Sequence, residues 1–480
     1  MPPKRGSSSR KDTAQAAAPP KRGRGQTKET APPSKRQRPL DLNLRTVPAT
    51  RLDVYVFGTN CAGELGLGDA TKKTEIPRPV LNPKLAADDV GVVHLAVGGM
   101  HSAALTHDNQ ILTWGVNDDG ALGRDTKQDP EDVKMRNVGD EDSADGESES
   151  EDEGNYNLKE ATPLPMDAAH FPAGTVFTQL AATDSATFAL TADGKVYGWG
   201  TFTNESGKKQ FLAVSTKERQ LTPVLIPSLE NVVHLAAGAQ HVLALISNGT
   251  VFTWGCNEQQ QLGRQRRVHT RPLHPLTPAQ CALPSGIVDI GAGVYHSFAV
   301  HKSGSVYAWG SNNFGQTAIF TSAGQSDATV QYPTKVQALK QFARVKSISG
   351  GKDHSLAVTA EGQCLSWGRI DNKALGVDIN AVPASSIIRD EHDRPRILKV
   401  PTAIGNIQDA IGLGIGTDHS FVITKEGHAY SWGFNAMHQT GQPGDDDVAR
   451  PTPLINKHVD GKKLVLADAG GQFSIVAGEH

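Results

Sequence analysis

Short runs of apolar residues, separated by turns, recur along most of this chain and end each time in a Trp-Gly pair. The first such window is LAVGGMHSAALTHDNQILTWG, residues 95–115. In the third window, an apolar run over His241–Ile246 is followed by a turn and by a second run over Val251–Trp254. Two short runs joined by a turn of this kind predict a β-hairpin.

Five further windows repeat the pattern, over residues 180–200, 235–255, 290–310, 348–368 and 413–433. Their turns carry Gly, and the first window has Asn109 there; both residue types accept the positive φ that such hairpin turns need. All six tryptophans of the chain fall in these windows, 85, 55, 55, 58 and 65 residues apart. We expect each Trp to fill the space between two repeats, and the Gly after it to mark a close backbone approach.

The two ends of the repeat region complement each other. Residues 466–480 match the first half of the repeat, and residues 54–68 match the second half, with Phe57 in the Trp position 57 residues before Trp114. A unit split between the termini is typical of a ring closed by pairing its first and last strands. The sequence therefore predicts an all-β fold, a seven-bladed β-propeller closed by its N- and C-terminal half-repeats, with roughly 50–65 residues per blade.

Charge is distributed unevenly along the chain. Its 480 residues carry a net charge of −3, yet residues 1–40 hold eleven Lys and Arg against two acidic residues, and the tract 140–154 is strongly acidic. Segments of such composition do not bury a core. We expect a disordered basic tail over 1–47 and a propeller over 48–480, interrupted by a disordered acidic insert over 126–162.

The sequence argues against several classes of function. Four cysteines are scattered without CxxC spacing, so we expect neither a disulfide framework nor a zinc site, and a reducing intracellular compartment fits best. No apolar run is long enough to span a membrane, and no signal-peptide core is seen. The phosphate-binding motif GxxxxGK[ST] is absent, and we expect no cofactor and no small-molecule substrate.

A histidine recurs at one repeat position, as His101, His241, His296, His354 and His419. These residues are either a set of metal-binding or acid–base groups, or the source of hydrogen bonds between neighbouring blades. Ligands spread around a wide ring do not converge on one ion. We therefore expect no metal site and favour the hydrogen bonds.

The pattern GGMHSAALTHDNQILTWGVNDDGALGR (98–124), repeated around a split last blade, resembles the regulator of chromosome condensation family over residues from about 50 to 480. A basic tail ahead of the propeller is similar to that of the nuclear members of this family. The resemblance implies guanine-nucleotide exchange on the small GTPase Ran, without covalent chemistry. It also implies a location on chromatin in the nucleus and a role in nucleocytoplasmic transport and mitosis.

In this family one blade carries a protruding β-wedge that inserts against the GTPase. The segment TFTNESGKKQFLAVSTKERQ (201–220) resembles the wedge in position and lacks the usual NxxGxLG continuation. We expect the working tip at Asn204–Leu212; a long variable loop between blades is the other interpretation. The resemblance implies GTPase contacts for Asp184, His354, His101, Asn204, Glu205, Ser206, Gly207 and Lys208.

Three positions depart from the family pattern. Cys61 and Gln240 stand where Asp is usual, and Phe473 stands where the last blade often has His. These three departures weaken the assignment of roles to single residues by resemblance. They leave the wedge interpretation unchanged, because it rests on a whole segment.

Two basic segments indicate chromatin as a partner. Arg266, Arg267 and Arg271 lie on a loop that resembles, in position, a family loop contacting the acidic histone surface, where Arg can bind carboxylates bidentately; a solvated loop is the alternative. The clusters of the tail indicate nuclear import and contact with DNA phosphates, or else a merely soluble arm. These clusters contain Lys4, Arg5, Lys21, Arg22, Arg24, Lys35, Arg36 and Arg38.

Two functions fit the sequence. One is a Ran exchange factor that also binds nucleosomal histones and DNA, and the other is a chromatin-bound propeller scaffold without exchange activity. The basic segments fit both, whereas the wedge segment and Asp184 favour the first, since a scaffold needs neither. A hydrolytic or lectin-like propeller would be expected to carry converging acids or a secretory signal.

Overall fold

The computed structural model describes residues 46–127, 157–264, 267–268 and 271–480. Almost all of the predicted tail 1–47 and most of the predicted insert 126–162 lie outside these residues. The ends of the insert are within them and are structured: Thr126 Oγ1 donates to Glu160 Oε1 at 2.7 Å, and Arg124 donates to the Lys159 carbonyl at 2.7 Å. Residues 126–127 and 157–162 of the predicted insert therefore belong to the described structure.

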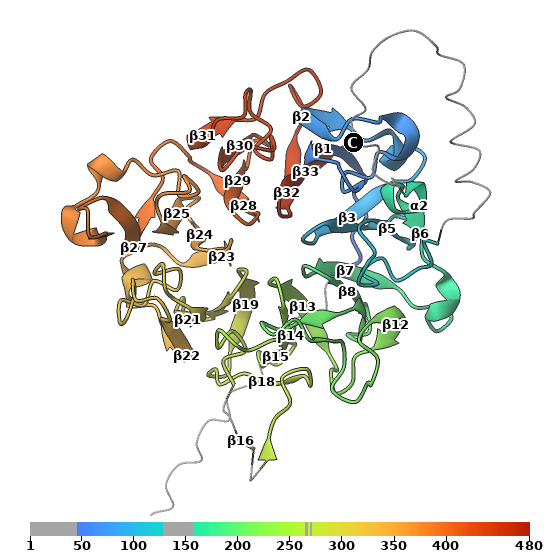
Figure 1. Cartoon of the computed structure of the whole chain (residues 1–480), viewed down its shortest axis with the longest axis horizontal. Coiled ribbons are helices and arrows are strands. Elements are labelled where there is room, and N and C mark those ends of the chain that lie inside the picture. The colour runs from blue at the N-terminus through green and yellow to red at the C-terminus, as the bar shows by residue number, and fades with distance from the viewer. Residues whose placement is uncertain (1–45, 128–156, 265–266, 269–270) are drawn as a thin grey trace, which may run out of the picture. The chain divides into compact units, whose positions relative to one another are not determined.

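Seven antiparallel sheets surround one axis in the described part of the chain (Figure 1). We number these blades 1 to 7 by their innermost strands, which contact one another around the ring until the seventh meets the first. The innermost strands are β3 (Val92–Val97), β7 (Phe177–Ala182), β13 (Val232–Ala237), β19 (Ile287–Ala292), β23 (Val345–Gly350), β28 (Ala410–Ile415) and β32 (Leu464–Ala469). The predicted seven-bladed propeller is confirmed.

Each blade continues outward through two more buried strands and an edge strand. The second strands are β4 (His101–Thr106), β8 (Ala186–Thr191), β14 (His241–Ile246), β20 (His296–His301), β24 (His354–Thr359), β29 (His419–Thr424) and β33 (Phe473–Glu479). The third strands are β5 (Ile111–Gly115), β9 (Val196–Gly200), β15 (Val251–Gly255), β21 (Val306–Ser311), β25 (Cys364–Arg369), β30 (Ala429–Gly433) and β1 (Leu52–Thr59). The fourth strands, which are edge strands in every blade but blade 5, are β6 (Leu164–Pro165), β12 (Gln220–Leu225), β18 (Ala279–Gln280), β22 (Thr329–Lys335), β27 (Pro395–Ala403), β31 (Val448–Pro453) and β2 (Glu75–Leu81).

Short elements complete the blades. Strand β26 (Ile387–Arg389) extends blade 5, and one α-helix of four residues, α2 (Leu158–Ala161), packs beside β5. The 3-10 helices are η1 (Gly68–Ala70), η2 (Pro83–Leu85), η3 (Ala168–His170), η4 (Gln337–Gln341), η5 (Ile379–Ala381) and η6 (Ala384–Ser386). Within the described residues, none of the helices has the length and apolarity needed to cross a membrane.

Blade 7 joins the two ends of the repeat region, as predicted. Strand β1 pairs with β33 in antiparallel register from Leu52 opposite Glu479 to Gly58 opposite Phe473. Because β1 thus supplies the third strand and β32 and β33 the first two, the ring closes without a free sheet edge inside it.

The Trp-Gly pairs also have the predicted roles. All six Trp side chains are fully buried between blades. The Gly after each Trp has a positive φ, and at Gly200 an added Cβ would lie 2.2 Å from the Ser185 carbonyl oxygen. The hairpin turns hold Gly or Asn109 at positive φ as well. At the positions after Trp only glycine, which has no Cβ, permits the two backbones to approach so closely.

One hydrogen-bonded circuit links neighbouring blades. A histidine Nε2 contacts a hydroxyl in the next blade, over 2.8–2.9 Å, in five pairs: His101 with Thr187, His241 with Ser297, His296 with Ser355, His354 with Ser420 and His419 with Ser474. The hydroxyl then donates to a loop carbonyl, and in blades 2, 4, 5 and 6 the Trp indole donates to the same carbonyl. The predicted blade-to-blade hydrogen bonds are therefore confirmed.

The departure at Phe473 leaves one member of the circuit without its partner. Phe473 occupies the histidine position of blade 7, and the buried Ser102 hydroxyl in blade 1 has no hydrogen-bond partner among the described residues. Blade 2 has Ala186 in the histidine position, but there the next blade has Val242, which needs no partner. Each histidine of the circuit thus faces a hydroxyl in the next blade, and the junction between blades 7 and 1 is where a hydroxyl lacks its histidine.

This mismatch predicts different costs for two chemically identical substitutions. Ser355→Ala leaves the buried His296 Nε2 without its partner and is expected to lower the free energy of unfolding by about 2 kcal/mol. Ser102→Ala removes a hydroxyl that is already unpaired, so it is expected to change that free energy by less than about 0.5 kcal/mol or to raise it. Urea denaturation of the two variants measures the difference; equal losses would contradict the circuit.

Candidate functional site

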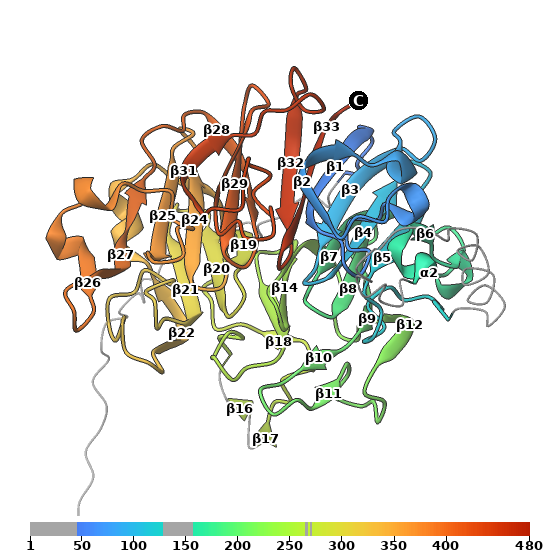
Figure 2. The ribbon, with the colours of Figure 1, turned by 45° about the horizontal axis from the view of Figure 1, so that its top comes forward.

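The strands fix which loops share a face of the propeller. In every blade the first and third strands run in the same direction, so the loops between strands one and two lie on the same face as the segments that follow strand three. We call this the loop face. Two protruding two-stranded segments follow third strands and leave the ring on this face: β10–β11 and β16–β17 (Figure 2).

The first protrusion is the segment predicted to be a wedge. Strands β10 (Phe202–Thr203) and β11 (Lys209–Gln210) form a hairpin whose turn spans residues 204–208. The Asn204 side chain accepts hydrogen bonds from the backbone N–H of Ser206, at 3.1 Å, and of Lys208, at 2.9 Å. Gly207 takes a φ of +77° and is open to solvent on its Cβ side. The turn is therefore shaped locally and its tip is exposed.

The root of the wedge is an aromatic cluster. Phe202 and Phe211 stack at 5.9 Å between ring centroids, and both lie against Phe188, whose other neighbour is Trp254. Phe211 is only 1% exposed, so the expectation that the working tip runs to Leu212 is corrected: the exposed tip is residues 205–208. Because the wedge replaces the usual loop, the buried Trp254 Nε1 has no acceptor among the described residues, unlike the other Trp side chains.

Both neighbouring blades brace the wedge. On the blade 1 side, Lys209 forms an ion pair with Asp119, which Arg219 also approaches at 3.5 Å. On the blade 3 side, Gln259 Nε2 donates to Glu205 Oε1 at 2.7 Å. The hairpin is therefore supported along its length and does not behave as a free loop.

Asp184 lies beside the wedge, in the loop between β7 and β8. Its backbone N–H donates to the Ala239 carbonyl at 2.9 Å, which ties this loop to blade 3. The side chain keeps contact with solvent, yet the protein atoms crowded around it raise the pKa of its carboxyl to about 6, against the lowering effect of a hydrogen bond from Gln240. At neutral pH this carboxyl is mainly ionised and presents a negative charge on the loop face.

The two histidines assigned to the GTPase contact lie beneath this surface. His101 and His354 are at most 1% exposed, and burial lowers the pKa of each imidazole to about 4. This burial does not fit a direct contact with a partner. His101 does lie next to the site, because its Nε2 contacts the Thr187 hydroxyl at 2.8 Å, on the strand that follows the Asp184 loop. It supports the loop, whereas His354 lies in blade 5, away from Asp184.

A second charged group on the loop face was not foreseen from the sequence. Arg369, directly after a Trp-Gly pair, contacts Asp353 at 3.1 Å and Asp371 at 2.6 Å, and its guanidinium lies 4.8 Å from the centre of the Phe314 ring. In the other blades this position holds an uncharged residue. That contrast is the only signal in the sequence that marks Arg369.

The second protrusion carries the predicted histone-binding arginines. Arg267 lies on β16 (Arg267–Val268) and Arg271 on β17 (Arg271–Pro272), which pair as a small hairpin, whereas Arg266 lies outside the described residues. The base of this arm is fixed by Arg264, which donates to the carbonyls of Thr277 and Pro275 at 2.8 Å. The eight Lys and Arg assigned to the tail also lie outside the described residues.

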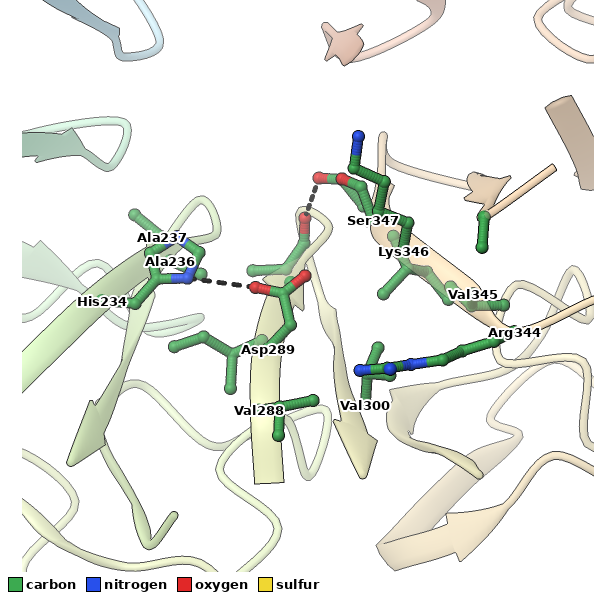
Figure 3. A pocket seen from close by; sticks show the side chains of 16 residues that line it. His234, Ala236, Ala237, Val288, Asp289, Val300, Arg344, Val345, Lys346 and Ser347 are labelled. Atoms are coloured by element: carbon green, nitrogen blue, oxygen red, sulfur yellow. Dashed lines mark hydrogen bonds and ion pairs between the residues drawn. The ribbon is translucent and has the colours of Figure 1, made fainter. Parts of the chain in front are cut away.

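A cavity of about 690 Å³ lies among the inner strands β13, β19 and β23. Two of the residues that line it are in contact, His234 Nδ1 with Asp289 Oδ1 at 3.1 Å (Figure 3). Arg344 and Lys346 line the same cavity. No residue expected to contact the GTPase lines it, and the described residues contain no cluster of His, Cys, Asp and Glu arranged for a metal ion.

Comparison with known proteins covers nearly the whole chain. Residues 53–476 match the family described as RCC1-like domain. The chain is 37% identical to the guanine nucleotide exchange factor SRM1 of Saccharomyces cerevisiae, over 89% of this chain and 87% of that protein. Two solved structures are similar as well. One is Prp20p of Saccharomyces cerevisiae, from work on its binding to Gsp1p and histones: TM-score 0.78, 34% identity, 91% of this chain and 93% of that one. The other is yeast RCC1 (Prp20) bound to Kap60: TM-score 0.81, 33% identity and 96% of each chain.

Proposed function

This chain belongs to the RCC1 family of propellers, and on that premise we propose that it is a guanine-nucleotide exchange factor for the small GTPase Ran. The observation that carries the proposal is the wedge of residues 202–211, rooted in the aromatic core and braced by the blades on both sides. A propeller that served only as a scaffold would not need a rigid projection beside an ionised carboxyl.

The mechanism follows from the rigidity of the wedge and the charge beside it. The exposed tip, residues 205–208, acts sterically on the loops that hold the nucleotide phosphates. The Asp184 carboxylate adds a negative charge. This charge repels the bound phosphate and competes with it for its magnesium ion. Both effects stabilise the nucleotide-free GTPase relative to the loaded one, so release accelerates although no covalent bond is made or broken.

Chromatin is the second partner that we propose. The arm of β16 and β17 carries Arg267 and Arg271 and suits an acidic histone surface, in line with the histone binding studied for Prp20p. The basic tail suits DNA phosphates and nuclear import, and the yeast structure with Kap60 supports the import role. These contacts would keep the exchange activity in the nucleus, on chromatin.

The direct test measures release of fluorescent GDP from Ran, with this protein present at about one hundredth of the Ran concentration. We expect turnover, with each propeller discharging many GTPase molecules. If folded protein fails to accelerate release, the exchange function is wrong, and the chromatin-bound scaffold becomes the function to pursue through its binding to nucleosomes.

A further inference from the structure

Within the proposed exchange function, on which this inference rests, we propose that Gln240 is a positioning residue that holds the wedge and the Asp184 carboxylate in one fixed geometry. Gln240 belongs to blade 3, in the loop between β13 and β14, whereas both of its partners belong to blade 2. Its half-buried side chain crosses the border between the two blades.

The two ends of the Gln240 amide are used by two different partners. Oε1 accepts the backbone N–H of Thr203, the last residue of β10, at 2.7 Å. The amide NH₂ is the donor whose interaction with the Asp184 carboxyl lowers the pKa of that carboxyl. An N–H can meet only the oxygen of the amide and a carboxylate only its nitrogen, so the partners themselves fix the orientation of the side chain.

The backbone around Gln240 is fixed by the same neighbours. Its carbonyl accepts the N–H of Cys256 at 2.7 Å, and Cys256 Sγ donates to the Thr203 carbonyl at 3.5 Å. The Thr203 backbone is thus held at its N–H by Gln240 and at its carbonyl by Cys256. A shift of the wedge root cannot occur without moving Gln240.

The corresponding side chains in other blades do not make this double contact. Asp418, at the same loop position in blade 6, accepts a hydrogen bond from Asn372 Nδ2 at 2.8 Å but has no donor to offer when ionised. Met100 in blade 1 has neither a donor nor a strong acceptor. An amide at position 240 is therefore suited to join a backbone N–H to a carboxylate.

The surroundings make the effect on Asp184 measurable. The other titratable groups around its carboxyl are His101, with a pKa of about 4, and Tyr295, whose pKa is raised by burial and by nearby carboxylates. Neither changes its charge between about pH 5 and pH 8. A change in titration in this range, near the pKa of about 6 for Asp184, therefore reports on Asp184 itself.

The test compares Gln240→Glu and Gln240→Ala with the wild-type chain. Gln240→Glu keeps the acceptor for Thr203 but places a second carboxylate next to Asp184, so we expect the Asp184 pKa to rise by about one unit and the pH profile of GDP release to move with it. Gln240→Ala removes both bonds, and we expect about tenfold slower release at neutral pH. The Asp184 carboxyl titration is followed by NMR, which requires no exchange activity.

The matched control is Gln179→Ala. Gln179 also joins blades 2 and 3, through bonds of 2.9 and 3.0 Å to the Leu235 backbone, but it lies on the inner strand β7 and not on the loop face. We expect lower stability with unchanged release by the folded protein and an unchanged pH profile. An Asp184 titration that is the same in all variants would overturn the role of Gln240. So would an effect of Gln240→Glu on the release profile that persists in an Asp184→Asn background. Failure of the wild-type chain to release GDP would instead overturn the exchange function.

Discussion

Replacing Asn204–Lys208 by a two-residue Asn-Gly turn is expected to lower the catalysed rate of GDP release at least ~100-fold, equivalent to about 2.7 kcal/mol of barrier, while the propeller stays folded. Thr203 lies opposite Lys209 in the hairpin, and Asn-Gly closes a two-residue hairpin with the correct twist. Removing Asn204–Leu212 instead, as the sequence suggests, would extract the buried Phe211 from the aromatic cluster and confuse loss of the tip with loss of stability.

Blade 5 offers a matched control for this variant. Its hairpin β26–β27 has a turn of the same length, residues 390–394, in which the Asp390 side chain accepts the N–H groups of His392 and Arg394, both at 2.9 Å. Asp393 takes a positive φ of 60°, as Gly207 does at the equivalent place. The same Asn-Gly replacement there is expected to leave GDP release unchanged. Equal activity of the two shortened proteins would remove the wedge from the mechanism.

Most of the fold could be predicted from the repeated sequence pattern. Trp, Gly and His recur because each blade must bury the same interface, and the interface demands a large filler, a close backbone approach and a hydrogen-bond donor at fixed positions. The split of blade 7 followed from the half-repeats at the two ends. Where one residue type solves the same packing problem many times, its position along the chain is enough to predict its role.

The site was less predictable because it arises where the repeat is broken. The wedge could be located as a segment without the repeat signature, but its root could not: Phe211 meets Phe188 and Trp254 only in the folded chain. The same holds for Gln240, which meets Thr203 across a blade border, and for Asp119 beneath Lys209. These contacts join single residues far apart in sequence, and no periodicity announces them.

The histidine circuit that unites the blades also predicts sensitivity to acid. Burial lowers the pKa of His101 and His354 to about 4 and that of His241, His296 and His419 to about 3, whereas an unfolded histidine has a pKa of about 6.5. The folded state therefore binds fewer protons than the unfolded state below this value. Stability is complete above about pH 6.5 and falls as the pH drops towards 4.

The expected effect is large because five groups act together. Between about pH 6.5 and pH 5 each histidine loses about 1.6 kcal/mol of its contribution, or about 8 kcal/mol in sum, which is comparable to the total stability of a domain. Asp468 and Asp184 act in the opposite direction, since burial raises their pKa values to about 7 and about 6 and both take up protons on folding in this range, so they offset part of the loss. We expect unfolding to begin near pH 5.

Urea denaturation at a series of pH values measures the slope of stability against pH, and two variants identify its source. His296→Gln removes one buried imidazole from the circuit and should remove about one fifth of the histidine contribution to the slope, whatever its cost at neutral pH. His428→Gln changes an exposed imidazole in a hairpin turn outside the circuit and is the control variant. A free energy of unfolding that stays level from about pH 7 to pH 5 would mean that the buried histidines accept protons without opening the blade interfaces, and the circuit would then not be what holds them together.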